Sequence, residues 1–225
     1  MAEKVDFKQS LPGYRAVKGR FDVVDLPPRQ YLMLDGSGDP NTSPAFAEAL
    51  ETIYPVAYAL KFASKKDLGR DYVVPPLEAL WWAEDLSRFT ARDKGSWQWT
   101  VMLMLPDWLG EAHYQTAIEA VQARGKATRL SDLRRETLDE GACLQTLHVG
   151  SFDDEGPVIG ELHRRITDEM GAALTGIHHE IYLSDFRRVA PEKLRTILRQ
   201  PLVRSVSAST TNASVSSANG ESKPK

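Results

Sequence analysis

The clearest pattern in the chain is a change between two hydrophobic periods, one typical of strands and one typical of helices. Residues 31–34 form a short apolar run, and a turn rich in Gly and Asp follows it. From Pro44 onward, apolar residues recur at steps of three and four positions, which predicts an amphipathic helix capped by Ser43. Strand patterns then occupy residues 77–82 and 97–105. The first half therefore predicts strand, helix, strand and strand.

The same order of elements is predicted again in the second half of the chain. A strand over 142–149 precedes a helix over 157–170, and strands over 177–183 and 195–202 follow, the last of them at a sheet edge. A helix over 111–123 lies between the two halves. Each half thus reads as a βαββ unit.

Two pairs of short strings indicate an internal duplication. The matched strings are Leu34–Asp39 with His148–Asp153, and Leu77–Trp81 with His179–Leu183. The second match pairs Glu78 with Glu180. Two βαββ units that share a sheet bury the face that a single unit leaves uncovered. We therefore predict an α+β fold of duplicated βαββ repeats with pseudo-twofold symmetry. Its mainly antiparallel sheet carries helices over one face and a central ligand cleft, which both glutamates face.

The composition divides the chain into an arm, one domain and a tail. Residues 1–24 are polar and mixed and predict an N-terminal arm. The domain covers 25–204, with repeats at about 25–125 and 126–204. Residues 205–225 are mostly Ser, Thr, Ala and Asn, and such a segment buries too little apolar surface to offset its ordering entropy. We expect this tail to be disordered.

Composition and charge exclude several classes of partner. Of the 225 residues, 42% are hydrophobic and 26% are charged, as in an ordinary globular protein. A net charge of −3 without a basic block argues against a nucleic-acid partner. The chain has one cysteine, Cys143, and no apolar run as long as a membrane span or a signal peptide core. We expect a cytoplasmic protein without a membrane or nucleic-acid partner.

Glu180 is the sharpest candidate for chemistry. It lies in an otherwise apolar strand, where alternation places it on one face with His178 and Tyr182. A carboxylate among apolar neighbours is costly unless it is paired, and such a group can bind a cation or accept a proton from water. The alternative is an edge-strand glutamate that faces solvent or binds an arginine.

Tryptophan is concentrated in one part of the chain. The five residues are Trp81, Trp82, Trp97, Trp99 and Trp108. An aromatic wall beside a carboxylate suits flat, hydrophobic and cationic molecules. The alternative is that these side chains fill the core. The ligand-binding candidates are Glu78, Trp81, Trp82, Trp99, His148 and His178, and the catalytic candidates are Glu180 and Tyr182.

The histidines do not show the spacing of a metal site. No pair has the i, i+4 arrangement with a neighbouring carboxylate, and there is no cysteine pair. A phosphate-binding loop and a nucleophile elbow are also missing from the sequence. We expect no metal and no cofactor.

Several longer strings resemble the stand-alone GyrI-like proteins over residues 20 to 203. They are Tyr31–Asn41, Pro76–Trp82, Leu144–Asp154, His179–Asp185 and Ala190–Arg199. That family is similar in fold to the effector-binding domains of multidrug-responsive transcription regulators, and the resemblance implies a duplicated βαββ module with a central cleft. It also implies a cleft glutamate, at Glu180, that meets hydrophobic or cationic ligands.

Some stand-alone members of the family are cyclopropanoid hydrolases, which add water to the cyclopropane of duocarmycin-like DNA alkylators. The resemblance implies that Glu180 activates this water while Tyr182 and the pair Trp81–Trp82 hold the flat drug. Detoxification by hydrolysis is therefore the first hypothesis for function. The alternatives are a non-enzymatic protein that sequesters or senses drugs, and a protein that contacts DNA gyrase. The sequence leaves the oligomeric state open.

Overall fold

The computed structural model describes residues 4–83 and 94–204, so the predicted disordered tail at 205–225 lies outside the described residues. Four α-helices are described: α1 (Phe7–Ser10), α2 (Pro44–Asp67), α4 (Glu111–Gln122) and α5 (Gly156–Arg164). The strands are β1 (Asp22–Leu26), β2 (Arg29–Ser37), β3 (Leu77–Trp82), β4 (Gln98–Met104), β5 (Arg134–Leu138), β6 (Gly141–Val149), β7 (Ala172–Leu174), β8 (His178–Tyr182) and β9 (Arg195–Arg204).

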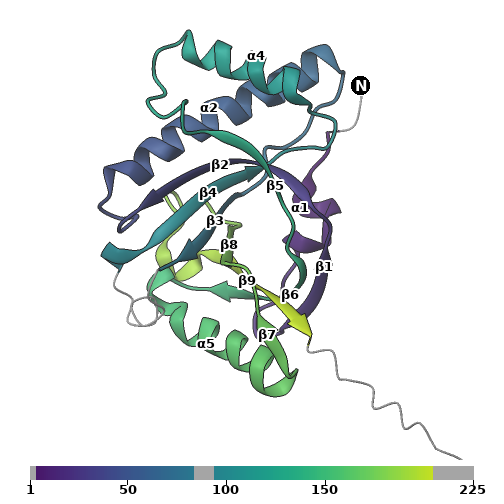
Figure 1. The fold of residues 1–225 in the computed structure, drawn as a ribbon, viewed down its shortest axis with the longest axis vertical. Coiled ribbons are helices and arrows are strands. Elements are labelled where there is room, and N and C mark those ends of the chain that lie inside the picture. The colour runs from purple at the N-terminus through teal and green to yellow at the C-terminus, as the bar shows by residue number, and fades with distance from the viewer. Residues whose placement is uncertain (1–3, 84–93, 205–225) are drawn as a thin grey trace, which may run out of the picture.

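The described strands form one antiparallel sheet in an α+β fold, as predicted. Its order is β1-β6-β9-β8-β3-β4-β2-β5, and β7 pairs with β9 beside this path. The segments β2-α2-β3-β4 and β6-α5-β8-β9 have the same order of elements, and their strands occupy mirrored places in the sheet. Strands β3 and β8 meet at its centre (Figure 1).

The two ends of the sheet are exchanged between the halves. Strand β1 runs into β2 but pairs with β6, and β5 runs into β6 but pairs with β2. Both pairings keep one register, because the numbers of partner residues add to 167 in each. The segment that contains β1 and β2 therefore forms one antiparallel ribbon with the segment that contains β5 and β6. This ribbon joins the ends of the sheet and curves it.

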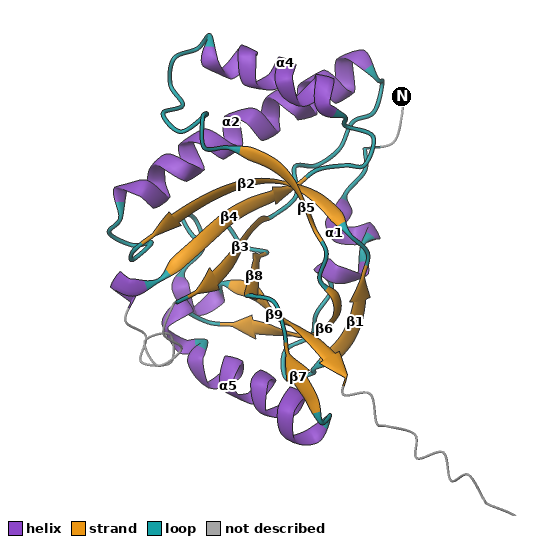
Figure 2. Cartoon of the chain, viewed as in Figure 1, coloured by secondary structure: helices purple, strands orange, loops and turns teal. Residues whose placement is uncertain are grey.

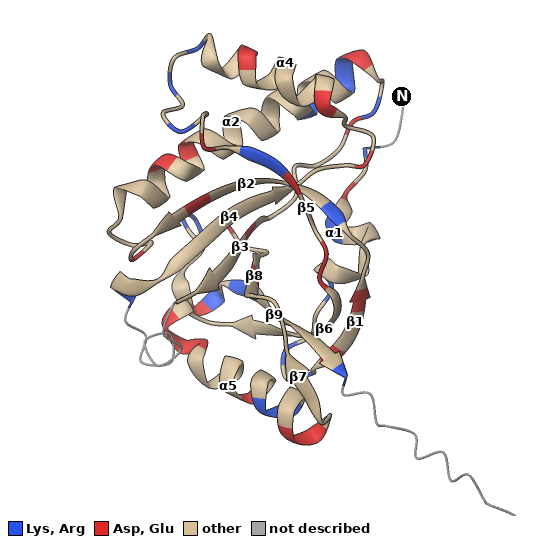
Figure 3. Cartoon of the chain, in the orientation of Figure 1, with Lys and Arg blue, Asp and Glu red and all other residues tan. Residues whose placement is uncertain are grey.

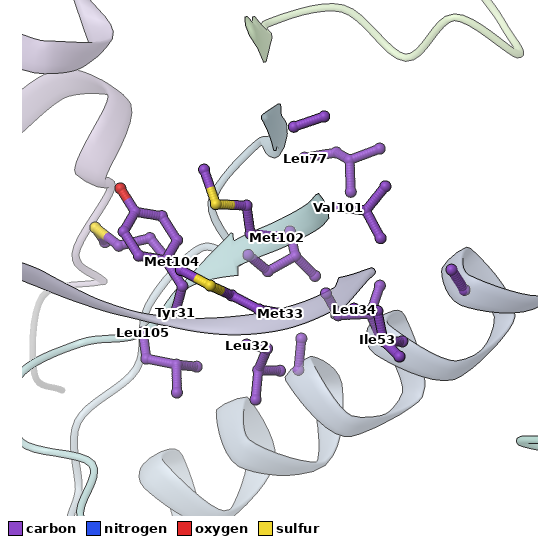
Figure 4. Close-up of a cluster of buried hydrophobic side chains, with 14 of the residues drawn as sticks. Tyr31, Leu32, Met33, Leu34, Ile53, Leu77, Val101, Met102, Met104 and Leu105 are labelled. Carbon is purple, nitrogen blue, oxygen red and sulfur yellow. The ribbon is translucent and has the colours of Figure 1, made fainter. Parts of the chain in front are cut away.

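Helices cover one face of the curved sheet, which we call the outer face. Helix α2 packs on β2, α4 packs on α2, and α5 packs on β6 and β9 (Figure 2). Alternation along β2 separates the two faces: Leu32 and Leu34 point to α2 and its Ile53, whereas Tyr31 and Met33 point the other way (Figure 4). The opposite face, which we call the inner face, is covered in part by the 3-10 turn Pro12–Tyr14.

Three features of the fold differ from the sequence prediction. Strand β9 is internal, between β6 and β8, and not at an edge. The predicted helix 157–170 is α5 followed by a π-helical turn at Arg165–Glu169. Strands β1, β5 and β7 were not predicted, because they are short and lack a continuous apolar face.

Positions occupied by Lys or Arg and by Asp or Glu are interspersed along the helices and strands (Figure 3). On α5 and the turn after it, for example, Arg164 and Arg165 pair with Glu161 and Glu169 at 2.7–3.3 Å. Among the described helices, none has the length and apolar character that crossing a membrane requires.

Candidate functional site

A cavity of about 300 Å³ lies on the outer face, where β3 and β8 meet beneath the N-terminal parts of α2 and α5. Its lining is mainly aromatic and apolar, with two buried carboxylates and one lysine. The lining residues are Pro40, Asn41, Phe46, Trp81, Lys94, Trp97, Phe152, Glu155, Gly156, Ile159, Gly160, His163, Glu180, Tyr182 and Phe186. A concave apolar site with a few polar groups is typical of small-molecule binding. We call it the outer cavity.

A chain of two hydrogen bonds holds the carboxylate at the floor of the outer cavity. Trp81 Nε1 donates to the Tyr182 hydroxyl oxygen at 2.8 Å, and the Tyr182 hydroxyl donates to Glu180 Oε2 at 2.8 Å. Burial, together with the charge of Glu180, raises the pKa of Tyr182 well above its usual range. Tyr182 therefore keeps its proton, and that proton is directed at Glu180.

The second oxygen of this carboxylate lies beside histidine. His178 Nε2 is 3.6 Å from Glu180 Oε1, and the His178 ring makes an edge contact with the His163 ring, with centroids 6.4 Å apart. Burial and the nearby His178 lower the pKa of His163, which favours a neutral imidazole at that wall of the cavity.

Aromatic rings form the remaining walls. Trp81 stacks on Phe46 from α2 at a centroid distance of 6.1 Å and meets the edge of Trp97 at 5.6 Å. On the other side, Phe152 makes an edge contact with Tyr182 at 5.5 Å. Flat apolar ligands gain favourable ring contacts on such walls.

The structure brings together only part of the predicted site. Trp81, Glu180 and Tyr182 line the outer cavity, and His178 contacts Glu180 from the same face of β8. Trp99, Trp82, His148 and Glu78 do not line it.

Trp99 is a core residue, which was the alternative interpretation of the tryptophans. It is 0% exposed, and its ring covers Gly36 so closely that a Cβ there would lie 2.1 Å from the ring. Trp82 lies on the inner face, because neighbouring residues of a strand point to opposite faces. His148 is buried, with Nε2 3.0 Å from the carbonyl oxygen of Ser151.

The expectation that Glu78 and Glu180 share a groove is wrong. Glu180 pairs in register with Ala79, so the neighbouring Glu78 points to the inner face. The match between the two strings does not determine the face on which each glutamate lies, because a shift of one residue exchanges the faces of a strand. The residues of β8 that share the face of Glu78 are Ile181, its register partner, and His179.

On the inner face, Glu78 belongs to a set of four buried charged residues, Glu78, Glu140, His179 and Arg199, which we call the inner cluster. His179 is 0% exposed, with Nε2 2.9 Å from Glu78 Oε2 and Nδ1 2.9 Å from Glu140 Oε1. Arg199 Nη1 lies 2.9 Å from Glu140 Oε2. The inner cluster borders a second cavity of about 210 Å³.

The charges of the inner cluster support one another. Burial lowers the pKa of His179, but the charge of Glu140 and the contacts with both carboxylates outweigh burial and raise it overall. Burial alone would raise the pKa of Glu140, yet His179 and Arg199 lower it to about 2. With His179 protonated, two carboxylates face two cations.

Several residues of the outer cavity were not predicted. Phe46 belongs to the apolar stripe that predicts the helix from Pro44, and this stripe does not indicate a cavity. Phe152, Glu155 and Phe186 come from turns whose placement depends on the fold. His163 is the next-to-last residue of α5, and the spacing of the histidines drew attention to it only in connection with metal binding. Among the described residues, no group of three His, Cys, Asp or Glu side chains is arranged to hold a metal ion.

Fold and cavity together define an α+β small-molecule-binding domain with two βαββ segments around a central aromatic site. The family described as the GyrI-like small molecule binding domain matches residues 20–202, and the chain belongs to this family. An uncharacterized conserved protein from Listeria innocua is 35% identical, with a TM-score of 0.80, over 89% of this chain and 100% of its own.

A second structure from Listeria innocua, described as a hydrolase, is 33% identical, with the same TM-score and coverage. The C-terminal domain of EcmrR has a similar fold, with a TM-score of 0.54 at 9% identity over 83% of this chain and 98% of its own. No curated protein matched the chain.

Proposed function

We propose that this protein binds flat hydrophobic or cationic small molecules in the outer cavity and hydrolyses cyclopropanoid DNA alkylators there, as a form of xenobiotic detoxification. The observation that carries the proposal is Glu180, a carboxylate that is 8% exposed, lines an aromatic cavity and is fixed by the Tyr182 hydroxyl. The similarity to a Listeria innocua protein described as a hydrolase supports the proposal of a hydrolytic activity.

The chemistry requires a base for one water molecule. The water oxygen forms a bond to a cyclopropane carbon as the carbon–carbon bond breaks, and the electron pair moves into the conjugated carbonyl of the drug. Glu180 accepts the proton that this water loses, through Oε1, since Oε2 already accepts a hydrogen bond from Tyr182. Positioned general-base catalysis contributes about 10²–10⁴ in rate.

In this proposal Tyr182 orients the base and does not donate to the drug. Its single hydroxyl proton is directed at Glu180, and its oxygen accepts from Trp81 Nε1. The ring of Tyr182 still contributes apolar surface to the cavity. Trp81 likewise has two roles: its ring forms part of the cavity wall, and its N–H belongs to the hydrogen-bond chain.

The binding part of the proposal rests on aromatic rings and negative charge. Both Glu155 and Glu180 are buried at the cavity, while Lys94 lies 2.6 Å from Asp153. Carboxylates in an aromatic cavity attract cationic ligands through charge and through ring faces.

The test is incubation of pure protein with a duocarmycin-type cyclopropanoid alkylator, with water addition followed by mass spectrometry. We expect the wild type to form the hydrated product. Glu180→Gln keeps the shape and the hydrogen bond from Tyr182 but removes the base, so it should bind the drug and lose about 10²–10⁴ in turnover. Turnover by Glu180→Gln at the wild-type rate would contradict the role of Glu180 as a base.

Non-enzymatic sequestration is the other outcome of this experiment. If the wild type binds the alkylator tightly and no hydrated product appears, the protein is a receptor, and Glu180 is a ligand contact. If neither binding nor turnover occurs, the small-molecule proposal fails for this class of compound.

A further inference from the structure

Strand β8 carries two different polar sets on its two faces. His178, Glu180 and Tyr182 point to the outer face, where Glu180 and Tyr182 line the outer cavity, while His179 and Ile181 point to the inner face. His179 is therefore the residue directly before the proposed base, on the other side of the same backbone. Any displacement of His179 along or across the strand also moves Glu180.

The contacts of His179 come from both sides of β8. Glu78 belongs to β3, the neighbour on one side, and Arg199 belongs to β9, the neighbour on the other side, where it is the register partner of His179. Glu140 lies in the two-residue link before β6 and contacts both His179 and Arg199. The imidazole is held between two carboxylates at 2.9 Å each.

The partners of His179 are themselves fixed by further segments. Glu78 Oε1 accepts a 2.5 Å hydrogen bond from the hydroxyl of Tyr14 in the N-terminal turn, and Tyr31 of β2 lies 3.5 Å from Oε2. Arg199 donates to Gln145 Oε1 at 3.1 Å and to the carbonyl oxygen of Gly13 at 2.6 Å. Through these contacts, the position of β8 is fixed relative to the N-terminal turn and to both neighbouring strands, β3 and β9.

This arrangement penalises any other position of β8. A one-residue slip would turn His179 to the outer face and leave Glu78 and Glu140 without their shared cation, and an uncompensated buried charge is strongly destabilising. On the outer face, the contacts of Glu180 with described residues are the hydrogen bond from the Tyr182 hydroxyl and the approach of His178 Nε2 to 3.6 Å.

We propose that His179 is a positioning residue for Glu180, and that the inner cluster sets the register of β8 so that the carboxylate faces the outer cavity at the correct place. The proposal rests on the proposed function for its turnover readout. It has a separate binding readout that does not depend on hydrolysis.

The first arm of the test measures kcat and KM for the duocarmycin-type alkylator in His179→Gln. A small misplacement of a reacting group costs on the order of 10²-fold, so kcat should fall by about 10- to 100-fold while KM changes by less than about threefold. The matched control is Ile181→Val, a conservative change at an equally buried residue on the same face of β8, which should leave kcat unchanged. Equal losses of kcat in His179→Gln and Ile181→Val would overturn the proposal.

The double variant Glu140→Gln, His179→Gln separates positioning from stability. It removes one negative and one positive charge, so it should regain resistance to urea relative to His179→Gln alone. If His179 is a positioning residue, the kcat of the double variant stays low, because the imidazole that contacts both carboxylates is still missing. A kcat that recovers together with stability would mean that His179 acts only by keeping the protein folded.

The second arm uses acridine orange, a flat aromatic cation, in a double-mutant cycle between His179→Gln and Glu180→Gln. In wild type, we expect Glu180→Gln to weaken binding at least fivefold. In the His179→Gln background, the same change should weaken binding less than twofold, because the carboxylate is already misplaced. Independent effects of the two changes overturn the positioning role, whereas absence of hydrated product in wild type overturns only the proposed hydrolysis.

The pH profile is a further readout that distinguishes His179 from a neutral packing residue. The groups that face its ring are Glu78 from β3, Glu140 from the β5–β6 link and Arg199 from β9, with Tyr14, Tyr31 and Cys143 next to these. Affinity for acridine orange should weaken as His179 loses its proton at alkaline pH, and His179→Gln should remove this step. A step that persists in His179→Gln arises from another group and contradicts the proposal.

Discussion

The two faces of the central strands β3 and β8 use a buried glutamate in opposite ways. On the outer face, Glu180 accepts a hydrogen bond from Tyr182, its one donor among the described residues, and opens onto a cavity of about 300 Å³ lined by aromatic rings. On the inner face, Glu78 is completely buried and meets His179, Tyr14 and Tyr31. The inner carboxylate is satisfied by the protein, and the outer one keeps an oxygen for a ligand or for water.

This difference assigns structure and chemistry to separate faces of one sheet. Buried ion pairs contribute little net stability compared with apolar residues of the same volume, but they strongly penalise arrangements that leave one charge alone. The inner cluster therefore specifies one register. The outer face can then present the Glu180 carboxylate to the cavity, because the inner cluster on the opposite face fixes the position of β8.

The largest expected effect is the loss of one cation from the inner cluster. Arg199→Ala leaves Glu140 with one partner and deprives the carbonyl of Gly13 of its donor, so we expect the free energy of unfolding to fall by about 3–5 kcal/mol. Urea denaturation followed by circular dichroism measures this. Arg20→Ala, which removes an exposed ion pair with Asp22, serves as the control and should change stability little. Similar losses in the two variants would show that the inner cluster is not energetically special.

The fold could be predicted from the sequence because its main signals are local. The run 31–34, the capped helix from Pro44 and the alternating strands at 77–82 and 142–149 each identify their own element. The sequence predicts an edge strand over 195–202, whereas β9 lies between β6 and β8. The neighbours of a strand depend on the order of the whole sheet, to which both halves contribute. Strand β5, with the sequence Arg-Arg-Glu-Thr-Leu, has no apolar face that would identify it.

The site was predictable only where one strand carried the information. Alternation correctly grouped His178, Glu180 and Tyr182 on one face. The same rule separates Glu78 from Glu180 once the register of β3 and β8 is known, but a register between two strands cannot be read from either strand alone. Trp99 became a core residue because Gly36 provides space for its ring across the β2–β4 pairing, a contact between distant parts of the sequence.

A second prediction tests the weaker support of the outer carboxylate. Tyr182→Phe removes the donor to Glu180 and leaves Trp81 Nε1 without its acceptor, which should cost about 1–3 kcal/mol of stability and weaken ligand binding. Tyr114→Phe is the matched control, because Tyr114 is also buried and its hydroxyl donates to the carbonyl oxygen of Leu133, away from the cavity. The control should lose stability but keep wild-type affinity. If Tyr182→Phe keeps the affinity as well, the hydroxyl has no role in presenting Glu180.

The third prediction concerns the loss of the His179 proton from the inner cluster as pH rises. The pKa of His179 is raised in the folded protein, so its contribution to stability is complete below the unfolded value of about 6.5 and is lost as pH rises through the folded pKa. The free energy of unfolding in urea should therefore decrease from about pH 6.5 upward, and His179→Gln should flatten this decrease. Measurements should stop near pH 8, because burial raises the pKa of Cys143 to about 12 and unfolded thiols begin to ionise near pH 8.5. A pH-independent wild type in this window would contradict a protonated His179.

The smallest expected effect is on ligand affinity, and it tests whether the ligand contacts only the outer face. Trp81 and Trp82 are adjacent, yet only Trp81 lines the outer cavity, and Trp82 lies half-buried on the inner face. Trp82→Ala should therefore leave the affinity for acridine orange unchanged within about twofold. Trp97→Ala, which removes a ring of the cavity wall, should weaken affinity by about 1–3 kcal/mol, the usual scale for an aromatic anchor. Isothermal titration calorimetry avoids the change in fluorescence that each substitution causes. If Trp82→Ala weakens binding as much as Trp97→Ala does, the ligand is not confined to the outer face, and the separation of roles between the two faces fails.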